Sequence, residues 1–167
     1  YRLKVASSVM FAWAHVYVND GLADQEFGAC MKVLQGHRTA STFSELGKYI
    51  ARFAMPKASP SITRLFTDSS NTNHLRKGDF PCSGCEFLNL VPIELRYFER
   101  VVAARNQCMP WVASLIAVLR VVRMLIKLKT CTVSAGALTE AINTHVWAST
   151  RQPMGMLAFA PSTTRLC

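Results

Sequence analysis

The sequence predicts an all-α domain of five to seven helices, packed around a central apolar helix at about residues 110–129. Three observations lead to this fold class. Apolar residues recur every three or four positions along most of the chain, as in helices with one buried face. The segment 110–129 is the most apolar and most regular of these stretches. Half of the 167 residues are apolar, which is enough for one continuous core in a single domain spanning 1–167.

The central helix is expected to bury most of its circumference and to expose one narrow charged line. Arg120, Arg123 and Lys127 are three and four residues apart, so they share one side. A membrane span is not favoured, because Arg120 and Arg123 would each cost about 2.5–3.5 kcal/mol at a bilayer centre. A helix lying on an anionic membrane surface would tolerate both arginines. The expected buried positions are Trp111, Val112, Leu115, Val118, Leu119, Val122, Leu125 and Ile126.

Two helices are predicted first, at about 5–18 and 23–35. Asn19-Asp20-Gly21 supplies the turn between them, and Gly36 ends the second helix. The second helix is expected to bury Ala23, Phe27, Cys30, Met31 and Leu34.

A third helix is predicted from a capping box formed by Thr42 and Glu45, and it should end before Pro56. Its inward face is Phe43, Leu46, Ile50 and Phe53. Ser59-Pro60 predicts a short helix carrying Ile62, Leu65 and Phe66. Residues 67–83 are polar and aperiodic, which indicates a long loop that is flexible or divides two subdomains.

The second half of the chain predicts three helices. Pro92 is expected to open the first, which should bury Leu95, Phe98, Val101 and Val102. A turn at 106–109 then joins it to the central helix as an αα-hairpin. The last helix is predicted at about 135–147, with Leu138, Ala141, Ile142 and Val146 buried. The tail from Ser149 contains two prolines and a glycine and is expected to be irregular.

Positive charge is concentrated on the helical pair at 94–129, which carries +5 of the formal net charge of +9. Such a concentration favours a polyanionic partner, and arginine, which outnumbers lysine twelve to seven, suits phosphate oxygens. The predicted function is a non-enzymatic basic binding module for nucleic acid or another acidic surface. A scaffold subunit of a larger complex and a membrane-surface protein are the alternatives. The predicted polyanion-binding residues are Arg96, Arg100, Arg105, Arg120, Arg123, Lys127, Arg76 and Lys77.

Zinc is the one cofactor that the sequence raises, since Cys82 and Cys85 are spaced to hold one side of a tetrahedral ion. His74 and Cys108 could complete the set. Ordinary reduced cysteines are the other interpretation, because no second CxxC or HxxxH pair exists. The segment 81–85 also resembles half of the zinc deaminase signature, P-C-x-x-C. No upstream histidine is followed two residues later by that family's proton-transferring glutamate.

Enzymatic templates are otherwise missing, so no catalytic residue and no cofactor other than zinc is predicted. The chain has no GxSxG, GxxxxGK[ST], HExxH or GxGxxG segment. Glu94 and Glu99 are expected to be solvated partners of nearby arginines, and His15 and His145 to be satisfied structural histidines. The six cysteines could form three disulfides, but most lie in or beside apolar helical runs, where a free thiol behaves as a small hydrophobe. With no glycosylation sequon in the chain, an intracellular, reducing compartment is expected. The chain begins with Tyr1, which suggests a processed form or a fragment of a longer polypeptide.

Overall fold

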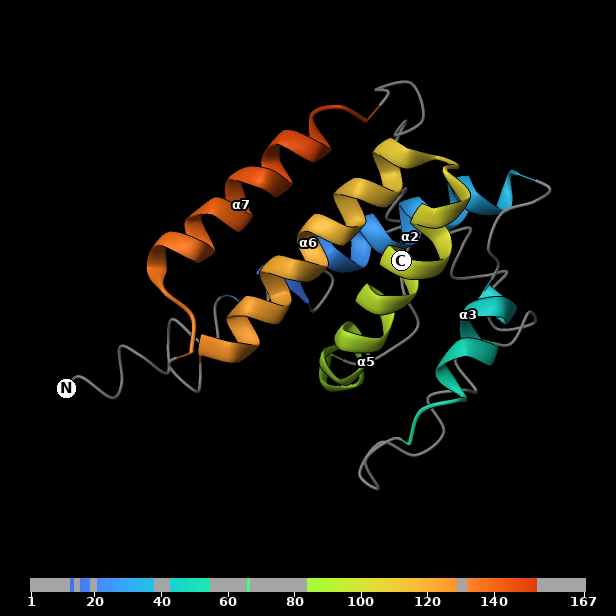
Figure 1. Ribbon diagram of the computed structural model, residues 1–167, viewed down its shortest axis with the longest axis horizontal. Helices are drawn as coiled ribbons and strands as arrows, with labels where there is room; N and C mark the ends of the chain where they lie inside the picture. Colours follow the sequence, from blue (N-terminus) through green and yellow to red (C-terminus); the bar gives the residue numbers. More distant parts are fainter. Residues whose placement is uncertain are drawn as a thin grey trace, which may run out of the picture.

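The computed structural model describes residues 13, 16–18, 21–37, 43–54, 66, 84–128 and 132–152. Within these ranges the chain is all-α, as predicted, and contains no strand (Figure 1). The π-helical turn η2 (Phe98–Val102) and the 3₁₀ turn η3 (Ala103–Arg105) join α5 to α6. The five α-helices are α2 (Leu22–Gln35), α3 (Phe43–Ile50), α5 (Gly84–Tyr97), α6 (Met109–Leu128) and α7 (Ala135–Ser149).

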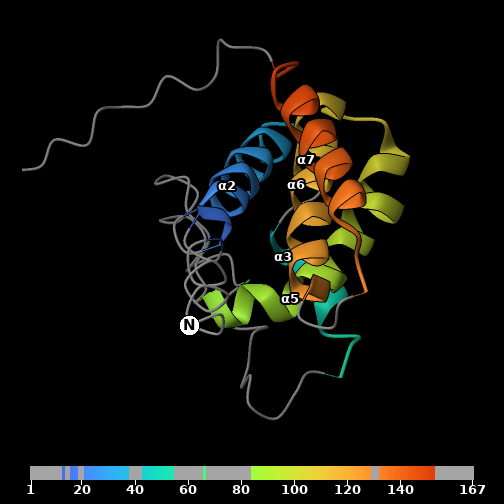
Figure 2. The same ribbon diagram turned by 90° about the vertical axis from the view of Figure 1, so that its left-hand side faces the viewer.

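Helix α6 is the hub of the fold, which confirms the central helix predicted at 110–129. It packs against α2, α5 and α7, and Figures 1 and 2 show α7 running alongside it. Arg120, Arg123 and Lys127 are exposed, as expected. All the apolar positions predicted to face inward are buried, apart from Ile126, which is half-buried.

Helix α2 was predicted almost residue for residue, and its five expected inward side chains are fully buried. The helix ends before Gly36, which stays in the right-handed region at φ −65°. The Phe27 ring contacts Phe98 edge-on at a centroid distance of 5.9 Å and also packs against Phe43. Aromatic rings thereby connect α2, α3 and η2 in one core. Of the helix predicted at 5–18, Trp13, Val16 and Tyr17 are helical, and most of the rest lies outside the described residues.

Helix α3 ends at Ile50, earlier than its predicted limit at Pro56. The chain continues through tight turns in which Arg52 N donates to Tyr49 O and Phe53 N to Ile50 O. Phe43, Leu46 and Ile50 are buried, as expected, and Phe53 is half-buried. Thr42 of the predicted capping box lies outside the described residues. So does the short helix after Pro60, except for Phe66, which is buried.

Helix α5 begins at Gly84, so the prediction that Pro92 opens this helix was wrong. Pro92 lies inside α5 and is exposed. Its missing N–H removes one backbone hydrogen bond, while the preceding turns bury Phe87, Leu90 and Val91. That apolar burial offsets the lost bond and keeps the helix continuous. After η3, Asn106 at φ 52° makes the left-handed turn into α6, so the predicted αα-hairpin is confirmed.

Ser134 caps the N-terminus of α7, where its hydroxyl accepts a hydrogen bond from Ala137 N at 3.2 Å. The prediction that Val146 is buried was wrong, because this residue is 53% exposed. His145 and Ala148 are buried instead. Apolar and polar residues are mixed around this helix, so its periodicity left its rotation poorly defined. The other predicted inward residues, Leu138, Ala141 and Ile142, are half-buried, so α7 packs against α6 turned by less than one residue position, or less than about 100°, from the predicted orientation.

Candidate functional site

One ion pair connects the predicted cationic residues of η2 and α6 and shows how these two segments are aligned. Arg120 donates to Glu99 Oε1 through Nε at 3.0 Å and through Nη2 at 2.6 Å. Because the two segments are antiparallel, the position one turn before Glu99 lies across from the position one turn after Arg120. Arg96 and Arg123 occupy these two positions, so the hairpin brings them to the same side.

Three arginines on this side have no carboxylate partner in the part of the chain that the structure describes. These are Arg96, Arg100 and Arg123, and all three are exposed. Lys127 is also exposed and extends the line of Arg120 and Arg123 by one turn. We define the basic face as Arg96, Arg100, Arg120, Arg123 and Lys127. Among the described residues, Glu99 is paired with one of these cations, and Glu140 of α7 lines the groove that Arg120 also lines.

Arg105 has a different neighbour from the basic face. Its guanidinium donates to both carboxylate oxygens of Glu45 on α3, and this hydrogen bonding raises its pKa above the ordinary value. The pair ties the end of the α5–η2–η3 segment to α3. The Arg105 guanidinium is therefore paired within the fold, although the pair itself is exposed to solvent. Arg76 and Lys77 lie outside the described residues.

The structure does not bring Cys85 and Cys108 together. Cys85 is in the first turn of α5, and Cys108 follows η3 at the other end of the same helical segment. Twenty helical residues lie between them. His74 and Cys82 lie outside the described residues, and within the described ones no three His, Cys, Asp or Glu side chains gather to hold a metal. A site built on Cys82 and Cys85 stays a prediction.

A buried polar cluster joins α2, α6 and α7, and sequence reasoning missed it. Glu26 accepts a hydrogen bond from Ser114 Oγ at 2.6 Å, and His145 Nε2 lies 2.5 Å from its other oxygen. The expectation that His145 is a satisfied histidine is confirmed. The carboxylate stands between serine and histidine, so the histidine does not contact the hydroxyl as a general base would. The cluster therefore positions α7 instead of activating a nucleophile.

Glu94 departs from its prediction as a solvated partner of the arginines. It is fully buried, and neither carboxylate oxygen has a hydrogen-bond partner within the described residues. Burial, together with the charge of the buried Asp24, raises its pKa from 4.5 to about 8. The prediction failed because Glu94 falls on the inward side of α5, one position before the buried Leu95. Glu99, in contrast, pairs with an arginine as predicted.

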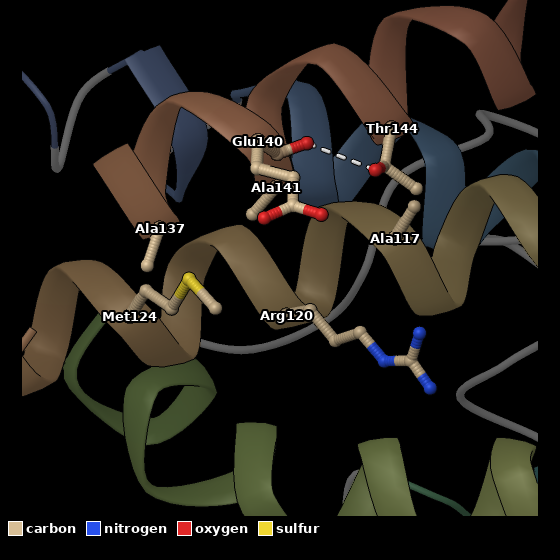
Figure 3. Close-up of a pocket in the computed structure, with 7 residues that line it drawn as sticks. All are labelled: Ala117, Arg120, Met124, Ala137, Glu140, Ala141 and Thr144. Atoms are coloured by element: carbon tan, nitrogen blue, oxygen red, sulfur yellow. Dashed lines mark hydrogen bonds between the residues drawn. The ribbon is translucent and has the colours of Figure 1, made fainter. Parts of the chain in front are cut away.

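A shallow groove of about 210 Å³ separates α6 from α7. In Figure 3 the Glu140 carboxylate reaches toward α6, while the Arg120 guanidinium points away from α7. The groove is open, so it cannot enclose a small molecule as an active site would. It is instead an open groove that borders the basic face at Arg120. Its lining residues are Ala117, Arg120, Met124, Ala137, Glu140, Ala141 and Thr144.

Helix α6 is the one described helix that is long and apolar enough to cross a membrane by length and composition. More than half of its most apolar window is buried inside the fold. The mostly buried core helix of a soluble protein passes the same test of length and composition. The expectation that it does not span a membrane stays a prediction.

No protein-family model matches this chain, and neither a curated protein nor a solved structure does. A function therefore has to be inferred from the chain's own residues.

Proposed function

We propose that the chain is a non-enzymatic helical module that binds a polyanion such as nucleic acid through the basic face. The observation that supports this proposal is the Glu99–Arg120 contact, since with this alignment of the two segments we expect Arg96 and Arg123 to lie on the same side. Two helical segments then contribute cations to one surface. An extended polyanion has its charges in a row, and a two-helix surface can meet several of them at once.

The chemistry of the side chains fits phosphate. Four of the five cations are arginines, and a guanidinium can donate two parallel hydrogen bonds to one phosphate group. Arg96, Arg100 and Arg123 require no exchange of a carboxylate partner before they bind. Arg120 would have to share its charge with Glu99 or exchange it, so we expect it to contribute less.

The test compares charge reversals on and off the basic face. Arg96→Glu and Arg123→Glu should each weaken binding to inorganic polyphosphate, and each should lower the slope of log affinity against log salt by about 0.7–0.9. Lys32→Glu is the matched control. Lys32 is exposed on α2. Glu26 of α2 bonds to Ser114 of α6, so α2 lies on the Ser114 side of α6. That side is about 120–180° around α6 from Arg120 and Arg123.

Fluorescence anisotropy with a labelled polyphosphate gives both the affinity and the salt slope. If the Lys32 variant loses as much affinity as the two arginine variants, binding depends on net charge alone and the basic face is not the site. If the wild-type chain shows no salt-dependent binding to any polyanion, the proposal fails.

A scaffold subunit is the second candidate, because Val146 and Trp147 on α7 are 53% and 58% exposed. Exposed apolar side chains of this size are typical of interfaces with protein partners. Sedimentation of the purified chain distinguishes the two functions. A monomer that retains polyanions supports the first, and a chain that self-associates through these residues and ignores polyanions supports the second.

A further inference from the structure

Trp147 has an unusual position for a tryptophan, since 58% of it is exposed. The Arg151 guanidinium lies over the indole, with Cζ 3.6 Å from the ring centroid. This stacking covers one face of the ring and places a cation against it. An exposed indole paired with an arginine presents both an aromatic surface and a positive charge.

Trp147 continues the wall of the groove that borders the basic face. Glu140, Thr144, Trp147 and Arg151 follow one another at intervals of four, three and four, so they form one line along α7. Glu140 and Thr144 line the groove, and Arg120 of α6 lines its opposite side (Figure 3). The indole therefore extends the α7 wall toward the helix C-terminus, on the side of α7 that faces the groove lined by Arg120.

We infer that the polyanion is a single-stranded nucleic acid, one of whose bases stacks on Trp147 while its phosphates contact the basic face. The inference rests on the proposed function and adds the substrate class to it. Binding of single strands without sequence preference combines a cationic track for the backbone with aromatic side chains for the bases. The faces of the bases are available for stacking in a single strand, whereas in a duplex they are stacked on each other.

An anionic membrane surface would also attract tryptophan and arginine, but the neighbours of Trp147 argue against it. The other residues of its line are Glu140, Thr144 and Arg151, which offer no apolar strip to insert between lipids. Val146 is exposed, but it lies about 100° away around the helix. A single indole in a polar line, stacked with Arg151, suits a base better than a bilayer.

The experiment uses the full chain and two polyanions, one with bases and one without. The first is an oligothymidylate of about 20 nucleotides, which is longer than typical single-strand sites. The second is inorganic polyphosphate. Trp147→Ala should weaken oligothymidylate binding by about 5- to 150-fold and leave polyphosphate binding unchanged. Trp147→Phe should restore most of the loss. Val146→Ala is the matched control, since it removes the neighbouring exposed apolar side chain from another side of the helix, and it should change neither affinity.

The outcomes distinguish base stacking on Trp147 from the proposed polyanion-binding function on which it rests. If Arg123→Glu weakens binding to both polymers and Trp147→Ala weakens neither or both equally, stacking is refuted and the polyanion function stands. Tighter binding of a duplex than of the single strand also overturns the inference. The inference is also overturned if the chain binds phosphatidylserine vesicles through Trp147 and does not bind oligothymidylate. If the wild type binds neither polymer, both proposals fail.

Discussion

Glu94→Gln should stabilise the protein, and the gain should grow with pH. The wild-type carboxyl is fully buried on α5 and has no hydrogen-bond partner among the described residues. Glutamine has nearly the same shape and carries no charge at any pH. The substitution therefore removes the cost of ionising this buried group and leaves the packing around it almost unchanged.

The magnitude follows from the pKa of Glu94, which rises from 4.5 to about 8 in the folded protein. The folded state then holds the proton more tightly than the unfolded state, so stability falls as pH rises from the unfolded pKa to the folded one. Below this window both states are protonated and the group has no effect. At about 1.4 kcal/mol per pH unit, the penalty approaches about 5 kcal/mol above pH 8. It is about 1 kcal/mol at pH 5.

Urea denaturation of both proteins at pH 5 and pH 8.5 measures this difference. The glutamine variant should exceed the wild type by about 1 kcal/mol at the lower pH and by about 4–5 kcal/mol at the higher one. Comparing the two proteins at each pH cancels the contributions of all other titrating groups. Glu99→Gln is the matched control, because Glu99 is partly exposed and paired with Arg120. Its loss should change stability by less than about 1 kcal/mol, in the destabilising direction.

A constant difference between the Glu94 variant and the wild type at both pH values would refute the reasoning. It would mean that the carboxyl is ionised in the folded state, with water or a cation compensating its charge. A glutamine variant less stable than the wild type at pH 8.5 would lead to the same conclusion.

Two further predictions concern packing. His145→Ala should lower the free energy of unfolding by about 2–5 kcal/mol, because it leaves the Glu26 carboxylate with only the Ser114 hydroxyl. The control Thr139→Ala, at an exposed position of the same helix, should lower it by less than about 1 kcal/mol. Equal losses of stability in urea denaturation would show that the cluster does not hold α7. Gly47→Ala should destabilise by about 1–3 kcal/mol, since an added Cβ would lie 2.7 Å from Phe66 Cβ. Gly136 has open space around it, so Gly136→Ala should stabilise the protein by up to about 1 kcal/mol. If the two glycine variants shift the melting temperature in the same direction, the close packing at Gly47 is contradicted.

The sequence was most informative where apolar and polar residues alternate cleanly around a helix. In α6 the charged line of Arg120, Arg123 and Lys127 is narrow, so its rotation in the fold could be predicted. The same holds for α2, whose inward side chains recur at regular intervals. In both helices burial of one face dominates the energetics, and local periodicity reports that burial directly.

Prediction failed where tertiary contacts outweighed local preference. Pro92 is a strong signal for a helix start, but the apolar residues before it gain enough from burial to extend α5 by two turns. Glu94 was assigned to the solvent because carboxylates are rarely buried without a partner. The Glu26–Ser114–His145 cluster joins residues from three helices, and no local pattern connects positions 88 and 119 residues apart.

The buried state of Glu94 also changes the charge of the proposed binding surface. The formal charge of +5 for residues 94–129 counts Glu94 as ionised. With a pKa of about 8 this carboxyl is mostly protonated at pH 7, so the segment carries a charge close to +6. Of its two glutamates, only Glu99 then opposes the five cations of the basic face, and it is already paired with Arg120. Ionisation of Glu94 above pH 8 would lower both the stability of the fold and the attraction of this surface for a polyanion.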